Sequence, residues 1–149
     1  MTTYFENVIM IDRPREEVFA FLADLENVPS WNPAIEVTWK TSPSSVGVGI
    51  EYRQIRSAPE RSEEVLEVTA FEPPRRLIIE LQVGPFRART GYTLEAAEAA
   101  TRLTNWVELE PPSIISQVVV PLAASQSKAV VASNLERLKR ILEDTRLSI

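Results

Sequence analysis

Between residues 35 and 109 the sequence alternates apolar and polar side chains in six successive segments separated by short turns. The clearest of these segments places five side chains on one face: Phe86, Ala88, Thr90, Tyr92 and Leu94. Such alternation is typical of strands with one buried face, and short turns join neighbouring strands in antiparallel order. The segment 62–72 departs from it, because its apolar residues cannot share one face without a β-bulge. The sequence therefore predicts a largely antiparallel sheet with one dry side.

The region before this sheet combines a strand with helical patterns. Residues 4–12 alternate as a first strand. A helix should follow, with Asp12 as its N-cap and Pro14 in an early helical position. The segment "ENVPSWNP" predicts a second, short helical turn that Pro33 ends.

The C-terminal region carries an apolar stripe at helical spacing: Ala124, Val131, Leu135, Leu138 and Leu142. Because Pro121 lacks a backbone donor, we expect a weak helix at 114–119 and a long one at 121–143. A helix of roughly 23 residues is about 35 Å long and can lie across a curved sheet. One helix does not fill the concavity of seven strands, so we expect residual space between the two layers.

Composition excludes several functional classes. The 149 residues fit one domain, 1–149, and the net charge of −5 with no basic cluster disfavours nucleic acid as a partner. Without Cys or His, the chain lacks the ligands of zinc and iron–sulfur sites, a Cys nucleophile and a His base. We expect no metal and no cofactor. No signal peptide or run of 18 apolar residues is present, so we expect a cytoplasmic protein without membrane insertion.

Five stretches occur in an order that resembles the START-like superfamily, also called the Bet v 1-like, SRPBCC or polyketide cyclase/dehydratase group. They are "IDRPREEVFAFLADLENVPSWNP", "VGVG", "TAFEPPRRLIIEL", "TGYTLEAAEAATRLTNWVELEPP" and "NLERLKRILE". The resemblance implies an α+β helix-grip fold: a seven-stranded curved antiparallel sheet wrapped around a long C-terminal helix, with two short helices between the first and second strands. It also implies an apolar cavity for small hydrophobic ligands such as lipids or polyketides. The family has no shared catalytic motif to transfer, so catalytic residues stay unassigned.

Candidate ligand-binding residues come from the predicted inward phases of the strands and from the "SWNP" segment, which the resemblance places at the mouth of the cavity. They are Trp31, Tyr52, Gln54, Ile79, Leu81, Thr90, Tyr92, Asn105 and Val107. Polar groups among apolar ones are typical of small-molecule sites. For Trp31 the alternative is a core anchor that touches no ligand, and for Asn105 it is a local hydrogen-bond network.

Two charged or aromatic features have other interpretations. Glu63, Glu64 and Glu67 are interpreted as a solvated strand face that pairs with Arg residues, in preference to a catalytic pair, and no inward carboxylate is evident. Trp106 follows the polar phase of its strand, so it is expected on the outer face, where a homodimer contact stays open.

Three functional hypotheses remain. The first is binding or transport of a small hydrophobic molecule, such as a lipid or polyketide, in an internal cavity. The second is a polyketide aromatase/cyclase or dehydratase-type enzyme that uses the same cavity, with Tyr or Glu moving protons. The third is a non-catalytic protein-interaction module that uses the outer face.

Overall fold

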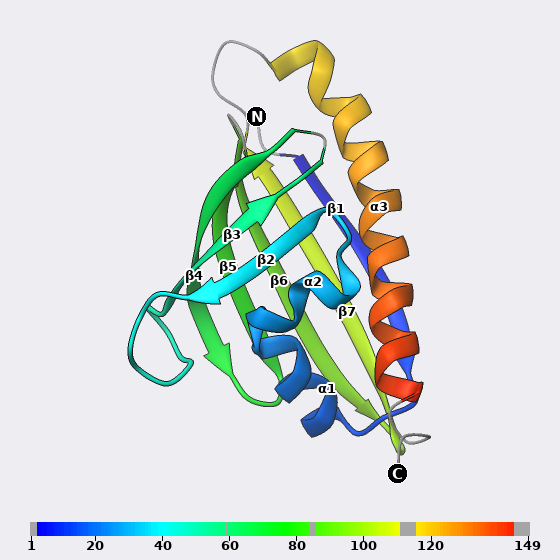
Figure 1. Ribbon diagram of the computed structural model, residues 1–149. Coiled ribbons are helices and arrows are strands. Elements are labelled where there is room, and N and C mark those ends of the chain that lie inside the picture. Colours follow the sequence, from blue (N-terminus) through cyan, green and yellow to red (C-terminus); the bar gives the residue numbers. More distant parts are fainter. Residues whose placement is uncertain (1–2, 59, 84–85, 111–115, 145–149) are drawn as a thin grey trace.

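The secondary-structure elements follow one another in the predicted order (Figure 1). The computed structural model describes residues 3–58, 60–83, 86–110 and 116–144, with side chains along the last helix from Ser127 onward. The elements are β1 (Thr3–Ile11), α1 (Arg15–Ala23), a 3-10 turn η1 (Leu25–Asn27), α2 (Val28–Trp31), β2 (Ile35–Lys40), β3 (Glu51–Arg56), β4 (Ser62–Glu72), β5 (Arg76–Val83), β6 (Phe86–Ala97), β7 (Ala100–Glu110) and α3 (Ser116–Asp144).

The strands form one antiparallel sheet in the order β1-β7-β6-β5-β4-β3-β2. Figure 1 shows the sheet curving around an interior, with α3 running along β1 and with α1 at the lower end. The predicted helix-grip fold, a curved seven-stranded antiparallel sheet with a long C-terminal helix and short helices after the first strand, is confirmed.

Two lysines of α3 fix the helix to the edge strand β1. Lys128 Nζ donates to the backbone carbonyl of Glu6, and Lys139 Nζ donates to that of Met10 at 2.8 Å. Asn7 Nδ2 in turn donates to the Lys128 carbonyl at 3.2 Å. These contacts occupy polar backbone groups that an edge strand otherwise leaves open to other chains.

The helical predictions need two corrections. The last helix is continuous from Ser116 to Asp144, so the predicted interruption at Pro121 is wrong. A proline removes one hydrogen bond from a helix, and the packing of a long helix against a sheet can outweigh that loss. The helix α1 begins at Arg15 with Pro14 in the cap position, so Asp12 is not its N-cap; the Asp12 backbone N–H donates to Glu143 Oε2 at 2.8 Å.

Two β-bulges set the phase of the strands. The expected bulge in β4 is present between Val68 and Ala70. A second bulge in β2, between Ile35 and Val37, was not predicted. It turns Val37 outward, where it is 44% exposed, and buries Thr38 instead, so the simple alternation expected for this strand is wrong.

The lower half of the interior is a dense apolar core. It is built by side chains from β1, α1, β6, β7 and α3: Ile11, Val18, Leu22, Leu94, Leu103, Leu135, Leu138 and Leu142. Each of these side chains contributes roughly 1.5–3 kcal/mol by leaving water. The same cluster continues along the sheet through β5, β6, β4 and β3, where it includes Leu77, Ile79, Tyr92, Leu66 and Tyr52.

Candidate ligand-binding site

The candidate strand residues lie in rows across the inner face of the sheet. In one row Leu77, Tyr92 and Asn105 are direct partners on β5, β6 and β7. In the next row Ile79, Thr90 and Val107 are partners on the same three strands. Cross-strand partners have Cβ atoms about 4.5–5.5 Å apart, so these residues form one continuous surface.

The remaining candidates border this surface from other strands and from α2. Leu81 continues β5 in the next row, and Leu66 on β4 pairs with both Leu81 and Tyr52. Gln54 follows on β3 and pairs with Glu64. Tyr52 and Gln54 are buried, as their predicted inward phase requires.

Asn105 is the central polar group of this surface. It is 1% exposed, and its Nδ2 donates to Thr90 Oγ1 at 2.8 Å and to the Gly91 carbonyl at 3.0 Å. Its carbonyl oxygen Oδ1 has no hydrogen-bond partner. The local network that was the alternative interpretation of Asn105 therefore exists, and it uses only half of the amide.

Burial governs the chemistry of the two inner tyrosines. It raises the pKa of Tyr92 to about 12, while a side-chain hydrogen bond with Thr90 acts in the opposite direction. Burial also raises the pKa of Tyr52, followed by the charges of Asp24 and Glu26. Both hydroxyls therefore keep their protons at neutral pH and can donate hydrogen bonds, but they do not act as bases.

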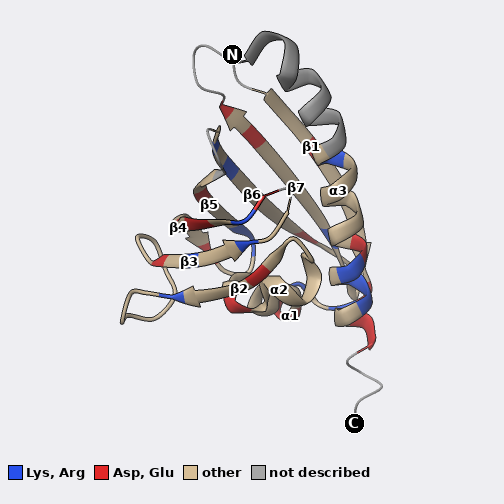
Figure 2. Ribbon diagram, turned by 45° about the horizontal axis from the view of Figure 1, so that its top comes forward, with Lys and Arg blue, Asp and Glu red and all other residues tan. Residues whose placement is uncertain are grey.

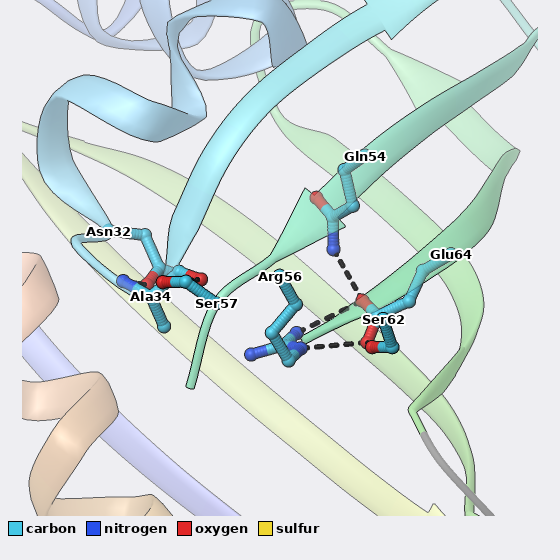
Figure 3. A network of polar contacts seen from close by, with 7 residues as sticks. All are labelled: Asn32, Ala34, Gln54, Arg56, Ser57, Ser62 and Glu64. Atoms are coloured by element: carbon cyan, nitrogen blue, oxygen red, sulfur yellow. Dashed lines mark hydrogen bonds and ion pairs between the residues drawn. The ribbon is translucent and has the colours of Figure 1, made fainter. Parts of the chain in front are cut away.

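A buried ion pair lies on the inner face where β3 ends and β4 begins (Figure 3). Arg56 Nε and Nη2 donate to the two oxygens of Glu64 at 2.7 and 3.2 Å. Gln54 Nε2 and Ser62 Oγ also donate to this carboxylate, at 2.7 and 3.2 Å. Four hydrogen bonds from three residues converge on this carboxylate, which makes it a well-satisfied buried charge.

This cluster overturns part of the prediction for the acidic residues. Glu64 is 3% exposed and points inward, so neither the solvated face nor the absence of an inward carboxylate holds for it. Glu64 lies on the same face of β4 as Leu66 and Val68. Gln54, which pairs with it on β3, was the sequence signal that could have revealed the inward orientation of Glu64. For Glu63 the prediction is correct, since Arg53 Nη1 pairs with it at 2.8 Å on the exposed side.

Trp31 sits at the end of α2 and is buried in the apolar core cluster. Its indole Nε1 has no hydrogen-bond partner. Trp31 therefore packs in the core, in agreement with one of the two interpretations of this residue. Ser57, which follows β3, links to the segment after Trp31, because its N–H and its Oγ donate to the Ala34 carbonyl at 2.8 and 3.3 Å. Within that segment the Ala34 N–H donates to Asn32 Oδ1 at 3.1 Å (Figure 3).

Trp106 lies on the outer face, as predicted, where it is half-buried and contacts two side chains of its own chain. Its ring stacks with Tyr4 at 6.4 Å, and the Arg89 guanidinium lies 5.6 Å from the ring centre. A Cβ added at Gly91 would overlap the indole, so this position has no room for a side chain. The same outer face of β1 carries the exposed side chains of Tyr4, Val8 and Met10.

Two surface hollows lie outside the inner face. One, of about 450 Å³, is lined mainly by charged residues of the outer sheet surface. The other, of about 570 Å³, lies between α1 and the β4–β5 turn, beside Phe19 and Phe71. Of the nine candidate residues, only Leu81 lines either of these two hollows.

Charges of both signs are spread over the strands and the C-terminal half of α3 (Figure 2). No helix among the described residues is long and apolar enough to cross a membrane.

Solved structures share this architecture. A START superfamily protein from Mycobacterium smegmatis is 16% identical with a TM-score of 0.75, over 93% of this chain and 98% of that one. TTHA0849 from Thermus thermophilus is 18% identical with a TM-score of 0.76, over 96% and 99%. The di-domain ARO/CYC StfQ of the steffimycin biosynthetic pathway is 9% identical with a TM-score of 0.79, over 100% of this chain and 53% of StfQ. At these identities the likeness establishes the fold alone.

Family membership rests on the sequence itself. No curated protein sequence matches the chain. A family model matches residues 2–143, which is nearly the whole chain. The chain belongs to the family described as polyketide cyclase / dehydrase and lipid transport.

Proposed function

We propose that the protein binds a small hydrophobic molecule, such as a lipid or polyketide, between α3 and the inner face of β5–β7. The observation that carries this proposal is the surface made by Ile79, Thr90, Tyr92, Asn105 and Val107, which combines apolar area with a few buried polar groups. Ligand sites of small molecules are mostly apolar and use such groups to fix orientation. The family description, which names lipid transport, agrees with this function.

The packing of the inner face supports the same location. Phe5, Ala88 and Val107 are buried, yet within the described part of the chain they do not belong to the apolar core cluster. They lie in the rows beyond Tyr92 and Asn105, away from the leucines of the lower half. Phe5 and Val107 therefore lie at the border of the packed core, in the same row as Ile79, which belongs to it.

A cyclase or dehydratase is the second candidate, and the inward carboxylate of Glu64 favours it. That carboxylate already accepts hydrogen bonds from Arg56, Gln54 and Ser62, so it is poorly placed to remove a proton from a substrate. The raised pKa of Tyr92 keeps this hydroxyl protonated and suits it to orienting a ligand. These features support binding over catalysis.

A neutral fluorescent probe tests the proposal. N-phenyl-1-naphthylamine gains fluorescence in apolar sites, and we expect wild-type protein to bind it. Val107→Trp, which fills the inner surface, should lose most of this signal, whereas Val8→Trp, at a position 48% exposed on β1, should keep it. Absence of binding by the wild type, or equal binding by both variants, would contradict the proposal.

The natural ligand is sought by native mass spectrometry of protein purified from its own source. A co-purified hydrophobic molecule is the expected result. If none is found, and a panel of lipids and polyketides does not raise the thermal stability, binding has no support.

A further inference from the structure

We infer that the bound molecule is largely apolar, and that it presents a neutral hydroxyl or N–H group to the side-chain carbonyl of Asn105. This inference rests on the proposed function and narrows the class of ligand.

The surroundings of Asn105 fix which way its amide faces. The backbone carbonyl of Gly91 can only accept a hydrogen bond, and it lies 3.0 Å from Nδ2. The Thr90 hydroxyl donates to the Trp106 carbonyl at 3.2 Å, so it accepts from Nδ2 at 2.8 Å. Because both neighbours need a donor, the nitrogen must face them and the carbonyl oxygen must face the other way.

The carbonyl oxygen is left without a donor. Asn7, the partner of Asn105 on β1, uses its Nδ2 to donate to the Lys128 carbonyl at 3.2 Å. Tyr92, the partner on β6, does not supply the missing donor either, because Oδ1 has no hydrogen-bond partner in the structure. A buried amide oxygen that lacks a partner is unfavourable, so a group that supplies the donor gains specificity as well as affinity.

The charges of the site decide between a neutral donor and a cation. Glu64 is the one buried carboxylate within the described ranges, and Arg56 already neutralises it. An ammonium group beside Asn105 would lose its water without a counter-charge, which is costly. A hydroxyl or neutral N–H satisfies the oxygen without that cost.

The test compares two ligands of nearly equal shape, 2-naphthol and 2-fluoronaphthalene, by displacement of N-phenyl-1-naphthylamine. Only the naphthol can donate a hydrogen bond. We expect wild-type protein to bind 2-naphthol at least as tightly as the more hydrophobic fluoro compound. In Asn105→Leu the ratio of the affinity for 2-naphthol to that for 2-fluoronaphthalene should fall about 3- to 10-fold, which corresponds to the free energy of one hydrogen bond. Asn134→Leu is the matched control, because this buried amide oxygen is already paired with Arg137 at 3.1 Å, and it should keep the wild-type preference.

The outcomes separate the two proposals. Tighter binding of 2-fluoronaphthalene by the wild type, or an unchanged preference in Asn105→Leu, would overturn this inference while leaving the proposed function intact. Failure of the probe and of both naphthalenes to bind would overturn the proposed function and this inference together. The wild-type comparison is decisive by itself if Asn105→Leu does not fold.

Discussion

The two ends of β7 present different side chains to the interior. In the lower half Leu103 of β7 meets the leucines of α3 in a core of apolar side chains from both layers. In the upper half the same strand presents Asn105 and Val107, and Val107 is buried outside that core. One strand therefore serves stability at one end and, in the proposed function, recognition at the other.

The upper half is also where charge is buried, and removing Arg56 should have the largest effect. Arg56→Met leaves the Glu64 carboxylate, whose side chain is 2% exposed, without its cation. We expect a loss of about 3–5 kcal/mol in the free energy of unfolding, measured by urea denaturation. Arg53→Met is the matched control on the same strand, because its pair with Glu63 is exposed and is worth about 0–1 kcal/mol. Equal losses would show that burial of the pair is unimportant.

A pair of identical substitutions on β7 tests the difference in packing. Leu103 is fully buried in the core, while Leu109 is half-buried and, among the described residues, lies outside the core cluster. Leu103→Ala should cost about 3–5 kcal/mol, and Leu109→Ala less than about 2 kcal/mol, in the same denaturation experiment. Similar costs would mean that the two ends of β7 are packed alike.

A smaller effect on the free energy of unfolding is expected from pH, through the ionisation of Tyr92, the residue of β6 that pairs with Asn105. Its pKa is raised from 10 to about 12 in the folded state, so the unfolded chain releases this proton first. The unfolded state then binds fewer protons, and stability should fall as the pH rises from about 10 towards 12. Tyr92→Phe should flatten this part of the profile of unfolding free energy against pH. A profile identical to that of the wild type would contradict the assigned burial of the hydroxyl.

The sequence predicts the fold well because regular alternation and turn residues are local signals. The inward phases of Tyr92 and Asn105 follow directly from the alternation along β6 and β7. The predicted interruption of the last helix at Pro121 was wrong. Helix propensity is a local quantity, and it does not include the free energy gained when the helix packs on the sheet.

The errors within the site also have physical causes. The bulge in β2 reverses the faces of Val37 and Thr38, and no residue type in that strand indicates it. Glu64 was grouped with its acidic neighbours, although its side chain faces Gln54 and Arg56 across the strand pair. The unpaired oxygen of Asn105 depends on the partners of its nitrogen, which only three-dimensional positions reveal.

The most direct test of the account is where a bound molecule lies. In a nuclear magnetic resonance titration of the labelled protein with N-phenyl-1-naphthylamine, backbone shifts should concentrate at Thr90, Asn105 and Val107, with little change at Leu103. Shifts confined to the groove beside Phe19 and Phe71, or no saturable shifts, would contradict the central claim that the ligand lies between α3 and the inner face of the sheet.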